Sequence, residues 1–486
     1  MSESKIGWSF DNTYSKLSNS MFTRISPTPV KDPTLVIFNE ELSGDLNLDF
    51  SNINDREKAL IFSGNKLPRG SETIAQAYAG HQFGHFTILG DGRALIVGEH
   101  IDAKKKRHDI QFKGSGKTPY SRNADGRAAV GPMLREYLIS EAMHHLRIPT
   151  TRSLAVVTTG EKVIREKDLK GAILTRVASS HLRVGTFQYA LITKNKNDLK
   201  NLCDYTIDRH YPFLKEKKLP AAELLKIVME KQIDLIINWM RVGFVHGVMN
   251  TDNMTVSGET IDYGPCAFMD EYDPGTVFSS IDHYGRYAYF NQPRVAKWNL
   301  ERFAESLIPL IHKENKKAIE IVTEIINDFP NQYKKKWMNM MKSKLGLIGE
   351  NDDDEKIIIE LLSWMHQKKA DYTNTFCYLM GELKIEDDNY QDEEFLYWEK
   401  KWKNHLLLNN NNFEKSLKIM KNFNPLLIPR NQIIEKLLKE ADENNFMSIK
   451  KYSEILSKPY VANSELREFQ QPPKDGTSKY VTYCGT

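Results

Sequence analysis

The sequence predicts an α+β protein with a β-rich first half and a mainly helical second half. Apolar runs typical of strands, such as residues 86–89 and 172–176, fall before residue 200. After residue 200, apolar residues recur at helical spacing, most clearly over residues 221–241. With 486 residues, of which 40% are hydrophobic, the chain can form one large two-lobed protein or two to three ordinary domains.

The charge balance and the cysteines exclude several classes of protein. Charged residues make up 27% of the chain but nearly cancel, so the formal charge of +3 selects neither nucleic acid nor an anionic membrane as a partner. The four cysteines are far apart and include no CxxC pair, which argues against a zinc ribbon and a dense disulfide framework. The start lacks the features of a signal or transit peptide, and no apolar run reaches about 18 residues. We therefore expect a cytoplasmic protein.

The β-rich part is expected to begin after an irregular lead-in. Four prolines between residues 27 and 68 indicate an extended N-terminal extension that packs on the core over residues 1–70. Residues 86–89 and 94–97 flank the turn-like sequence Gly90-Asp-Gly-Arg, which predicts an antiparallel hairpin. Residues 109–112 predict a neighbouring strand. A second strand pair is expected at 153–158 and 172–176, with its turn at Thr159-Gly160.

Helices are predicted where apolar residues follow the helical period. Pro132 suits a first helical turn and opens a helix over residues 131–147, and a long amphipathic helix is expected over 221–241. Further helices are expected at 300–312, 315–327, 354–367 and 430–441. The predicted parts are thus an extension (1–70), a β-rich lobe (71–200), a helical lobe (201–457) and an extended, unpacked tail (458–486).

Charged residues of the kind found in a protein-kinase active site occur in the order of that site. Lys113 ends a predicted strand and Glu136 lies in the next helix. The segment from His246 to Asp252 and Asn253 follows, and then Asp262-Tyr-Gly. In a kinase the strand lysine grips phosphate oxygens and pairs with the helix glutamate, while the asparagine and the last aspartate hold metal ions. The order and spacing predict a kinase-like two-lobed fold.

The segment from His246 to Asn253, the catalytic segment, departs from the kinase pattern at one position. When His246 and Asn253 are aligned with the ends of the kinase motif, Val248 stands where the aspartate base belongs. Two explanations remain open at this point. The chain is a non-catalytic relative of kinases, or Asp252 has taken over a carboxylate role in a different reaction geometry.

Arginines of the β-rich half form a second candidate set. Their guanidinium forks suit phosphate oxygens better than a lysine does. Arg176 and Arg183 are favoured because the segment between them contains no acidic residue. The full set is Arg93, Arg122, Arg127, Arg176 and Arg183.

Six longer motifs resemble the selenoprotein O family. They are Tyr78-Ala-Gly-His-Gln-Phe-Gly-His, Leu89-Gly-Asp-Gly-Arg-Ala, Gln111-Phe-Lys-Gly-Ser-Gly-Lys-Thr-Pro-Tyr-Ser-Arg, Asp125-Gly-Arg-Ala-Ala-Val, His246-Gly-Val-Met-Asn-Thr-Asp-Asn-Met and Ile261-Asp-Tyr-Gly-Pro-Cys-Ala-Phe-Met-Asp. The resemblance is strongest over residues 76–274. It implies a pseudokinase fold that binds ATP in a flipped orientation and transfers AMP to Ser, Thr or Tyr hydroxyls of proteins, with UTP and UMP as the alternative donor and group.

The resemblance also implies roles for individual residues. Lys113 and Glu136 would form an ion pair, Asn253 and Asp262 would hold Mg²⁺ or Mn²⁺, and Asp252 would accept the proton. The nucleotide would be lined by Lys113, Asp262, Gly90, Gly92, Arg93, Asp125, Gly126, Arg176 and Arg183. The expected partners are protein substrates, with no nucleic acid and no membrane, and the chain is expected to be a monomer.

The end of the chain differs from animal members of the family. They carry selenocysteine near the C-terminus, whereas this chain has Cys484. We hypothesise that this thiol pairs with Cys266, just beyond the Asp-Tyr-Gly turn, or with another cysteine, and controls activity by redox state. An unreactive Cys484 is the alternative.

Three functions remain in competition. The first is an AMP or UMP transferase, the second a conventional protein phosphotransferase, and the third a nucleotide-binding scaffold without catalysis. Val248 argues against the phosphotransferase. A scaffold has little need for Asp252, Asn253, Asp262 and the arginines together.

Overall fold

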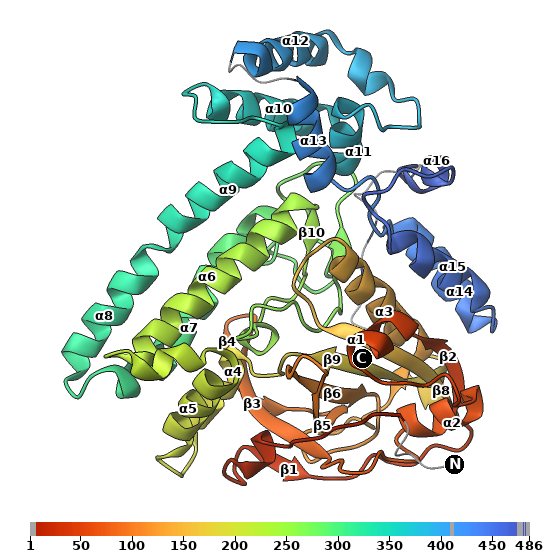
Figure 1. The fold of residues 1–486 in the computed structure, drawn as a ribbon, viewed down its shortest axis with the longest axis vertical. Coiled ribbons are helices and arrows are strands. Elements are labelled where there is room, and N and C mark those ends of the chain that lie inside the picture. The colour runs from red at the N-terminus through yellow and green to blue at the C-terminus, as the bar shows by residue number, and fades with distance from the viewer. Residues whose placement is uncertain (1–5, 409–412, 474–479, 481, 483–486) are drawn as a thin grey trace.

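The computed structural model describes residues 6–408, 413–473, 480 and 482. Strands gather in the first part of the chain, and helices dominate the second part (Figure 1). This division confirms the predicted α+β class with a β-rich first part and a mainly helical second part. None of the described helices combines the length and the apolar character needed to cross a membrane.

A nine-stranded antiparallel sheet forms the first part, in the order β1-β3-β5-β6-β9-β8-β2, with β4 paired to β3 and β7 to β9. Both outer strands, β1 and β2, come from the first 70 residues, so this lead-in adds strands to the sheet. The bounds are β1 Phe22–Arg24, β2 Thr34–Phe38, β3 Ile74–Gln82, β4 His85–Gly90, β5 Ala94–Ile101, β6 Arg107–Lys113, β7 Ala128–Ala129, β8 Arg152–Ile164 and β9 Asp168–Ala178.

The predicted turn at Gly90-Asp-Gly-Arg is wrong, because β4 and β5 do not pair with each other. Both pair with β3, which reverses into β4 through Phe83 and Gly84, two residues with positive φ. Residues 90–93 form a bulge instead of a turn. Asp91 holds this bulge to β3, since its carboxylate accepts the Gln76 N–H at 3.0 Å and its own N–H donates to the Gln76 carbonyl at 2.9 Å.

The predicted turn at Thr159-Gly160 is also wrong, because the strand pair continues past these two residues. The strands on either side of it were placed correctly, since 153–158 lies in β8 and 172–176 lies in β9, and β8 and β9 pair. The pair continues to Ile164 and Asp168, and its register shifts between Thr158 and Lys162. Gly160 has φ +70° at this irregularity, so the glycine marks a bulge within the strand.

Alternation along the central strands places two apolar cores on opposite faces of the sheet. Leu95 and Val97 of β5 contribute to the smaller core, whereas Ile96 contributes to the larger one. The smaller core is completed by residues of the N-terminal 62, including those of α1 (Glu40–Asp45) and α2 (Asp55–Phe62). The larger core extends into the helical part.

Helix α3 (Val130–His145) packs on the larger-core face of the sheet and matches the predicted helix over 131–147. Helices α14 and α15 pack against it from the C-terminal part, and Figure 1 shows them beside α3. A helix enclosed on several sides is buried nearly all round, and most residues from Val130 to Met143 are buried. The position of α3 therefore depends on both parts of the chain.

The helical part contains the predicted helices and several more. Residues 221–241, 315–327, 354–367 and 430–441 correspond to α6, α8, α10 and α14, and residues 300–312 form the second half of α7. The bounds are α4 Val184–Ile192, α5 Asp198–His210, α6 Pro220–Arg241, α7 Gln292–Ile311, α8 Asn315–Asn327, α9 Phe329–Leu345, α10 Asp354–Lys368, α11 Tyr372–Leu379, α12 Glu393–Leu408, α13 Phe413–Phe423, α14 Asn431–Asp442, α15 Met447–Leu456 and α16 Leu466–Phe469.

The described part of the tail is packed, contrary to the expectation of an extended, unpacked segment. It contains α16, and Leu466 and Gln470 are fully buried. The Asn374 side chain donates to the Gln470 carbonyl at 2.9 Å. Buried backbone groups here are satisfied by polar side chains of the helical part, which is how a segment without strong periodicity packs.

Candidate active site

A four-charge cluster lies where the sheet meets α3. Strand alternation sends Ile110 and Phe112 of β6 into the smaller core and directs Lys113 to the opposite face, toward α3. The Lys113 Nζ atom lies 2.7 Å from Glu136 Oε2 and 2.7 Å from Asp262 Oδ1. The expected Lys113–Glu136 pair is therefore present in the structure, and Asp262 joins it.

Arg176 of β9 is the second cation of this cluster. It hydrogen-bonds Glu136 Oε1 through Nε, and its Nη2 lies 2.6 Å from Asp262 Oδ1. Burial alone would favour neutral Glu136, but Arg176 and Lys113 lower its pKa. Burial also opposes ionisation of Asp262, yet Lys113, Arg176 and Arg93 hold its pKa well below the usual range. The two cations and the two carboxylates thus stabilise each other's charged forms.

The catalytic segment lies opposite this cluster and follows β10 (Phe244–Val245), which pairs with β11 (Ala267–Phe268). His246 is fully buried, and its Nε2 lies 2.9 Å from the Ile261 carbonyl, which joins the segment to the Asp262 turn. The Asn253 amide donates to the Val248 carbonyl at 3.0 Å. Asn253 closes a short 3₁₀ turn, Thr251–Asn253, and this backbone bond orients its side chain.

Asp252 is almost fully buried under β3. Its Oδ1 atom has no hydrogen-bond partner among the residues that the structure describes. A Cβ atom at Gly80 would lie 2.2 Å from this oxygen, so only glycine lets β3 pass so closely. Burial raises the pKa of Asp252 to about 6, and Arg183 opposes this shift. A buried carboxylate oxygen without a partner is costly for stability and typical of a functional group.

Two adjoining cavities share Gln82, Arg93, Lys113, Asp252 and Asp262 in their walls. The first, of about 490 Å³, is also lined by Glu136, Val248 and Asn253. The second, of about 330 Å³, is lined by the predicted nucleotide-binding residues Gly90, Gly92, Arg93, Lys113, Asp125, Gly126, Arg176, Arg183 and Asp262. The structure therefore brings the predicted site residues together around one continuous space, apart from the cysteines.

The second cavity is strongly basic. Seven cationic side chains line it against four carboxylates. The cations are Arg93, Lys113, Arg122, Arg127, Arg165, Arg176 and Arg183, and the carboxylates are Asp91, Asp125, Asp252 and Asp262. Guanidinium groups arranged around a small cavity are suited to a polyphosphate.

Several lining residues were not predicted from the sequence. Arg165 donates two hydrogen bonds, of 2.9 and 3.1 Å, to the Asp125 carboxylate. No sequence pattern indicates Arg165 as a site residue. Tyr78 lies under the Arg183 guanidinium, 4.2 Å from the ring centroid. Tyr78 and Gln82 fall in the first of the family motifs, which was the available signal. Arg135 also lines the first cavity and holds the Gly264 carbonyl at 3.0 Å.

One of the two cysteines of the redox hypothesis, Cys266, lies among the described residues. Cys266 is free and fully buried, and burial raises the pKa of its thiol, with Arg135 opposing that shift. Cys484 lies outside the described residues. Thr482 donates to the Pro265 carbonyl at 2.8 Å, so this point of the tail lies beside the residue that precedes Cys266. The pairing of Cys484 stays a prediction.

The donor set fits a hard divalent cation. Mg²⁺ and Mn²⁺ prefer carboxylate and amide oxygens. Asp262, Asn253 and Asp252 line the same cavity. Lys113 and Arg176 both contact the Oδ1 atom of Asp262. The Asn253 amide uses its nitrogen, and not its oxygen, for the bond to the Val248 carbonyl. Residues Asn253 and Asp262 thus have oxygen atoms to offer a metal ion.

The arrangement resembles a protein-kinase site in which the base has been lost. A strand lysine pairs with a helix glutamate, and an asparagine and the aspartate of an Asp-aromatic-Gly turn face the same cavity. Val248 lines this cavity where a kinase has its aspartate. Among solved structures, ROP2 from Toxoplasma gondii, described as a virulence factor with a protein-kinase fold and no enzymatic activity, matches 68% of this chain and 87% of its own at TM-score 0.24 and 9% identity.

Comparison of sequences gives a much closer match. The chain is 56% identical to a protein nucleotidyltransferase YdiU from Pelagibacter ubique, over 99% of this chain and 100% of the relative. It is 55% identical to a protein of the same name from Nitrosococcus oceani, over 100% and 99% of the two chains. The profile of the family described as "Protein adenylyltransferase SelO" matches residues 5–457. The chain belongs to the SelO family of protein adenylyltransferases.

Proposed function

We propose that this chain transfers AMP from ATP to Ser, Thr or Tyr hydroxyls of protein substrates and releases pyrophosphate. The observation that supports the proposal is a basic cavity with an acidic residue, Asp252, in its wall, at a position other than that of the kinase base. Val248 replaces the kinase aspartate, and buried Asp252 lies between the basic cavity and the Asn253 side of the site. Transfer of UMP from UTP is the alternative form of this proposal.

The basic cavity holds the terminal phosphates in this proposal. Its seven cations exceed its four carboxylates, so a bound polyanion is favoured there. Arg176 and Lys113 are held in place by Glu136 before any ligand arrives, which lowers the entropy cost of binding. With the β- and γ-phosphates buried in this cavity, the α-phosphorus lies beside Asp252.

Asn253 and Asp262 would hold Mg²⁺ or Mn²⁺ in the adjoining cavity. When bound, the ion neutralises charge on the phosphate oxygens and polarises the phosphorus. Asp252 lines the same cavity, so a second role for its carboxylate as a metal ligand is compatible with its accepting a proton.

Asp252 accepts the proton of the attacking hydroxyl. The hydroxyl oxygen forms a bond to the α-phosphorus, and the bond from that phosphorus to the bridging oxygen of pyrophosphate breaks. Arg93, Arg176 and Arg183 stabilise the charge that develops on the leaving group. Because the hydroxyl must approach Asp252 in line with the departing pyrophosphate, the site favours attack on the α-phosphorus over the buried γ-phosphorus.

Labelled ATP distinguishes the three functions. Purified full-length chain is incubated with Mg²⁺ or Mn²⁺ and ATP labelled at the α- or the γ-phosphate, with a general protein substrate, and the protein products are weighed intact. Transfer of α-label with an added adenylyl mass is expected. Transfer of γ-label would establish a phosphotransferase instead, and bound ATP without transfer to any substrate, including the chain itself, would favour a scaffold.

Asp252→Asn is expected to lower the AMP transfer rate about 10²- to 10⁴-fold, the range for loss of a positioned base. The amide keeps the shape but cannot accept a proton, so ATP affinity should change by less than the rate. Turnover and nucleotide affinity are measured side by side, with Asp204→Asn on the exposed face of α5 as the charge-matched control. Equal losses of affinity and rate would show a structural role for Asp252.

The remaining properties are proposals of the same kind. The near-zero formal charge of +3 supports the absence of nucleic acid and membrane partners. A monomeric state and a cytoplasmic location are proposed on the sequence alone.

A further inference from the structure

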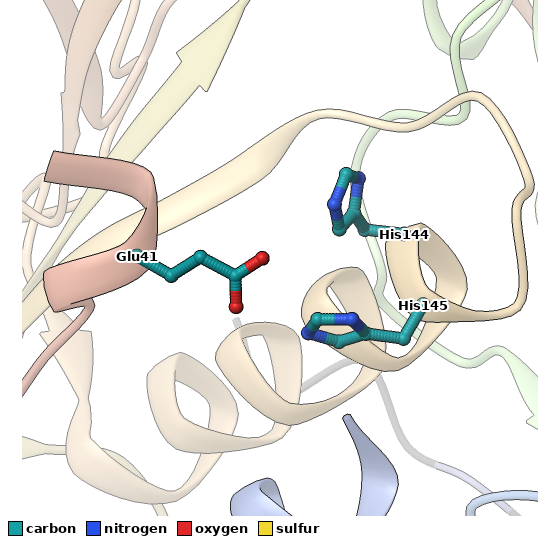
Figure 2. A group of neighbouring side chains, drawn as sticks. All are labelled: Glu41, His144 and His145. Atoms are coloured by element: carbon teal, nitrogen blue, oxygen red, sulfur yellow. The ribbon is translucent and has the colours of Figure 1, made fainter. Parts of the chain in front are cut away.

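Three potential metal ligands meet on the side of the molecule where α1 approaches α3. Glu41 lies in the first turn of α1, and His144 and His145 end α3. Their ligand atoms all lie within 4.8 Å of one another. Figure 2 shows the carboxylate and both imidazole rings extending into the same space between the two helices. None of these residues lines the two cavities of the active site.

These side chains are free to bind a ligand. In the described parts of the chain, no hydrogen bond or ion pair engages the side chains of Glu41, His144 or His145, and the two rings contact only each other among aromatic groups, at 5.1 Å. Arg152, whose charge acts on both imidazole rings, pairs with Glu141 at 2.7 Å. Partly buried imidazoles without protein partners are unusual, because polar atoms in such places normally find one.

The alternative explanation for histidines at a helix C-terminus is a favourable interaction of the charged ring with the helix dipole. That explanation requires protonated rings. Burial lowers the pKa of His144 and of His145, with Arg152 acting in the same direction and Glu141 and Glu41 in the other. Neutral imidazoles at neutral pH interact weakly with the dipole but present the lone pairs that a metal ion needs.

The surroundings of the cluster attract cations and admit water. Glu41 and His145 line a separate cavity of about 430 Å³. Five carboxylates line it against two lysines: Glu40, Glu41, Asp55, Glu141 and Glu454 against Lys58 and Lys450. The excess of negative charge raises the local concentration of cations. The cavity is large enough to hold a water molecule as a further ligand.

The donor types select the class of metal. Two imidazole nitrogens and one carboxylate suit Zn²⁺ and related transition metals, whereas Mg²⁺ and Ca²⁺ prefer oxygen ligands throughout. Zinc lies about 2.0–2.2 Å from such atoms, so the three ligands must move closer together on binding. Glu41 is exposed and can rotate to do so.

We propose that Glu41, His144 and His145 form a zinc-class metal site that fastens α1 to the C-terminal end of α3. The bound ion cross-links the N-terminal extension to the helix that carries Glu136 of the four-charge cluster. It does so about two turns from Glu136, because His144 follows Glu136 by eight positions in the helix. The site is therefore structural and does not take part in nucleotide chemistry.

The test is a titration of the metal-free full-length chain with Zn²⁺ in saturating Mg²⁺, followed by calorimetry. Co²⁺ replaces Zn²⁺ in a parallel titration, because its absorption spectrum reports nitrogen and oxygen coordination. We expect Glu41→Gln, His144→Ala and His145→Ala each to weaken the affinity at least about 10-fold, since even residues behind the ligands have effects of this size. Zn²⁺ should also raise the unfolding temperature of the parent and not of these variants.

Two matched controls separate this site from general surface binding. Glu40→Gln removes a neighbouring carboxylate of the acidic cavity and should lower the Zn²⁺ affinity far less than loss of a ligand does. His366→Ala removes an exposed imidazole of α10 and should bind Zn²⁺ as the parent does. Unfolding of each variant without zinc establishes that it folds. Crystals soaked in Zn²⁺ and measured at the zinc absorption edge locate the ion without any variant. Parent-like affinity in the three ligand variants, or an ion bound elsewhere in the crystal, overturns the proposal.

Discussion

Asp262→Asn is expected to reduce AMP transfer on the order of 10³-fold or more while leaving the chain folded. The change removes a charge that the proposed mechanism needs at the metal, and metal ions supply several kcal/mol of transition-state stabilisation. Lys113 and Arg176 lose the charge of one of their two shared carboxylate partners, yet both keep Glu136. Their uncompensated charge still attracts phosphate, so nucleotide binding without metal should persist.

The measurement compares initial rates over a range of Mg²⁺ and Mn²⁺ concentrations with nucleotide affinity in the presence of a chelator. Asp273→Asn is the control, because this partly exposed carboxylate follows the same turn but lies outside both cavities. Retention of more than about a tenth of the parent rate at saturating metal would remove Asp262 from the proposed metal site, since metal-ion effects are far larger than tenfold.

Arg430→Met is expected to destabilise the protein by about 3–5 kcal/mol, the usual effect of breaking a buried ion pair from one side. Arg430 is 1% exposed and binds two buried carboxylates, Asp270 and, at 2.7 Å, Asp371. It also donates to the carbonyls of Phe469 and Gln470, at 3.2 and 3.1 Å. One guanidinium thus joins the segment after β11, the start of α11 and the end of α16, so its loss leaves two unpaired charges inside the protein.

The free energy of unfolding is measured by denaturant titration of the parent and the variant. Arg430→Met combined with Asp270→Asn should be less destabilised than Arg430→Met alone, because one of the unpaired charges is then removed. Lys451→Met breaks an exposed ion pair with Glu465 and should be indistinguishable from the parent. A double variant that is no better than the single one would show that packing around Arg430, and not charge, is what the protein loses.

Much of the candidate site could be predicted because its chemistry requires particular residue types in a particular order. Lys113, Glu136, Asn253 and Asp262 were found from their sequence order, and the structure places them around one continuous space. The absence of an aspartate at Val248 pointed to Asp252 before any geometry was known.

Strand and helix positions followed from periodicity, whereas the turns were misplaced. Gly90 and Gly160 were both assigned to turns, and both lie at bulges within long strand pairs. A glycine next to polar residues has the same local preference in either setting. Only the partner strand distinguishes a turn from a bulge, and here β3 and the Asp91 hydrogen bonds to Gln76 make that difference.

Helices α9 and α12 were missed for a related reason. Trp398 and Trp402 of α12 donate indole hydrogen bonds to the carbonyls of Ile357 and Leu345, both at 3.0 Å. These contacts cross from one helix to others far along the chain. This region contains many lysines and asparagines, so the spacing of its aromatic residues was only a weak indication of a helix. Tertiary packing supplies most of the stability of such helices.

The sequence by itself determined the fold class, the family and the residues that carry charge at the site, since these depend on composition, period and motif order. Only the tertiary structure decided which charges meet. Arg176 lies in β9 and Lys113 in β6, and their pairing with Glu136 and Asp262 depends on strand register and on where α3 packs. The same holds for Glu41 and the histidines of α3, which are about a hundred residues apart along the chain and adjacent in space. Side-chain proximity between distant segments is set by packing, which no local pattern encodes.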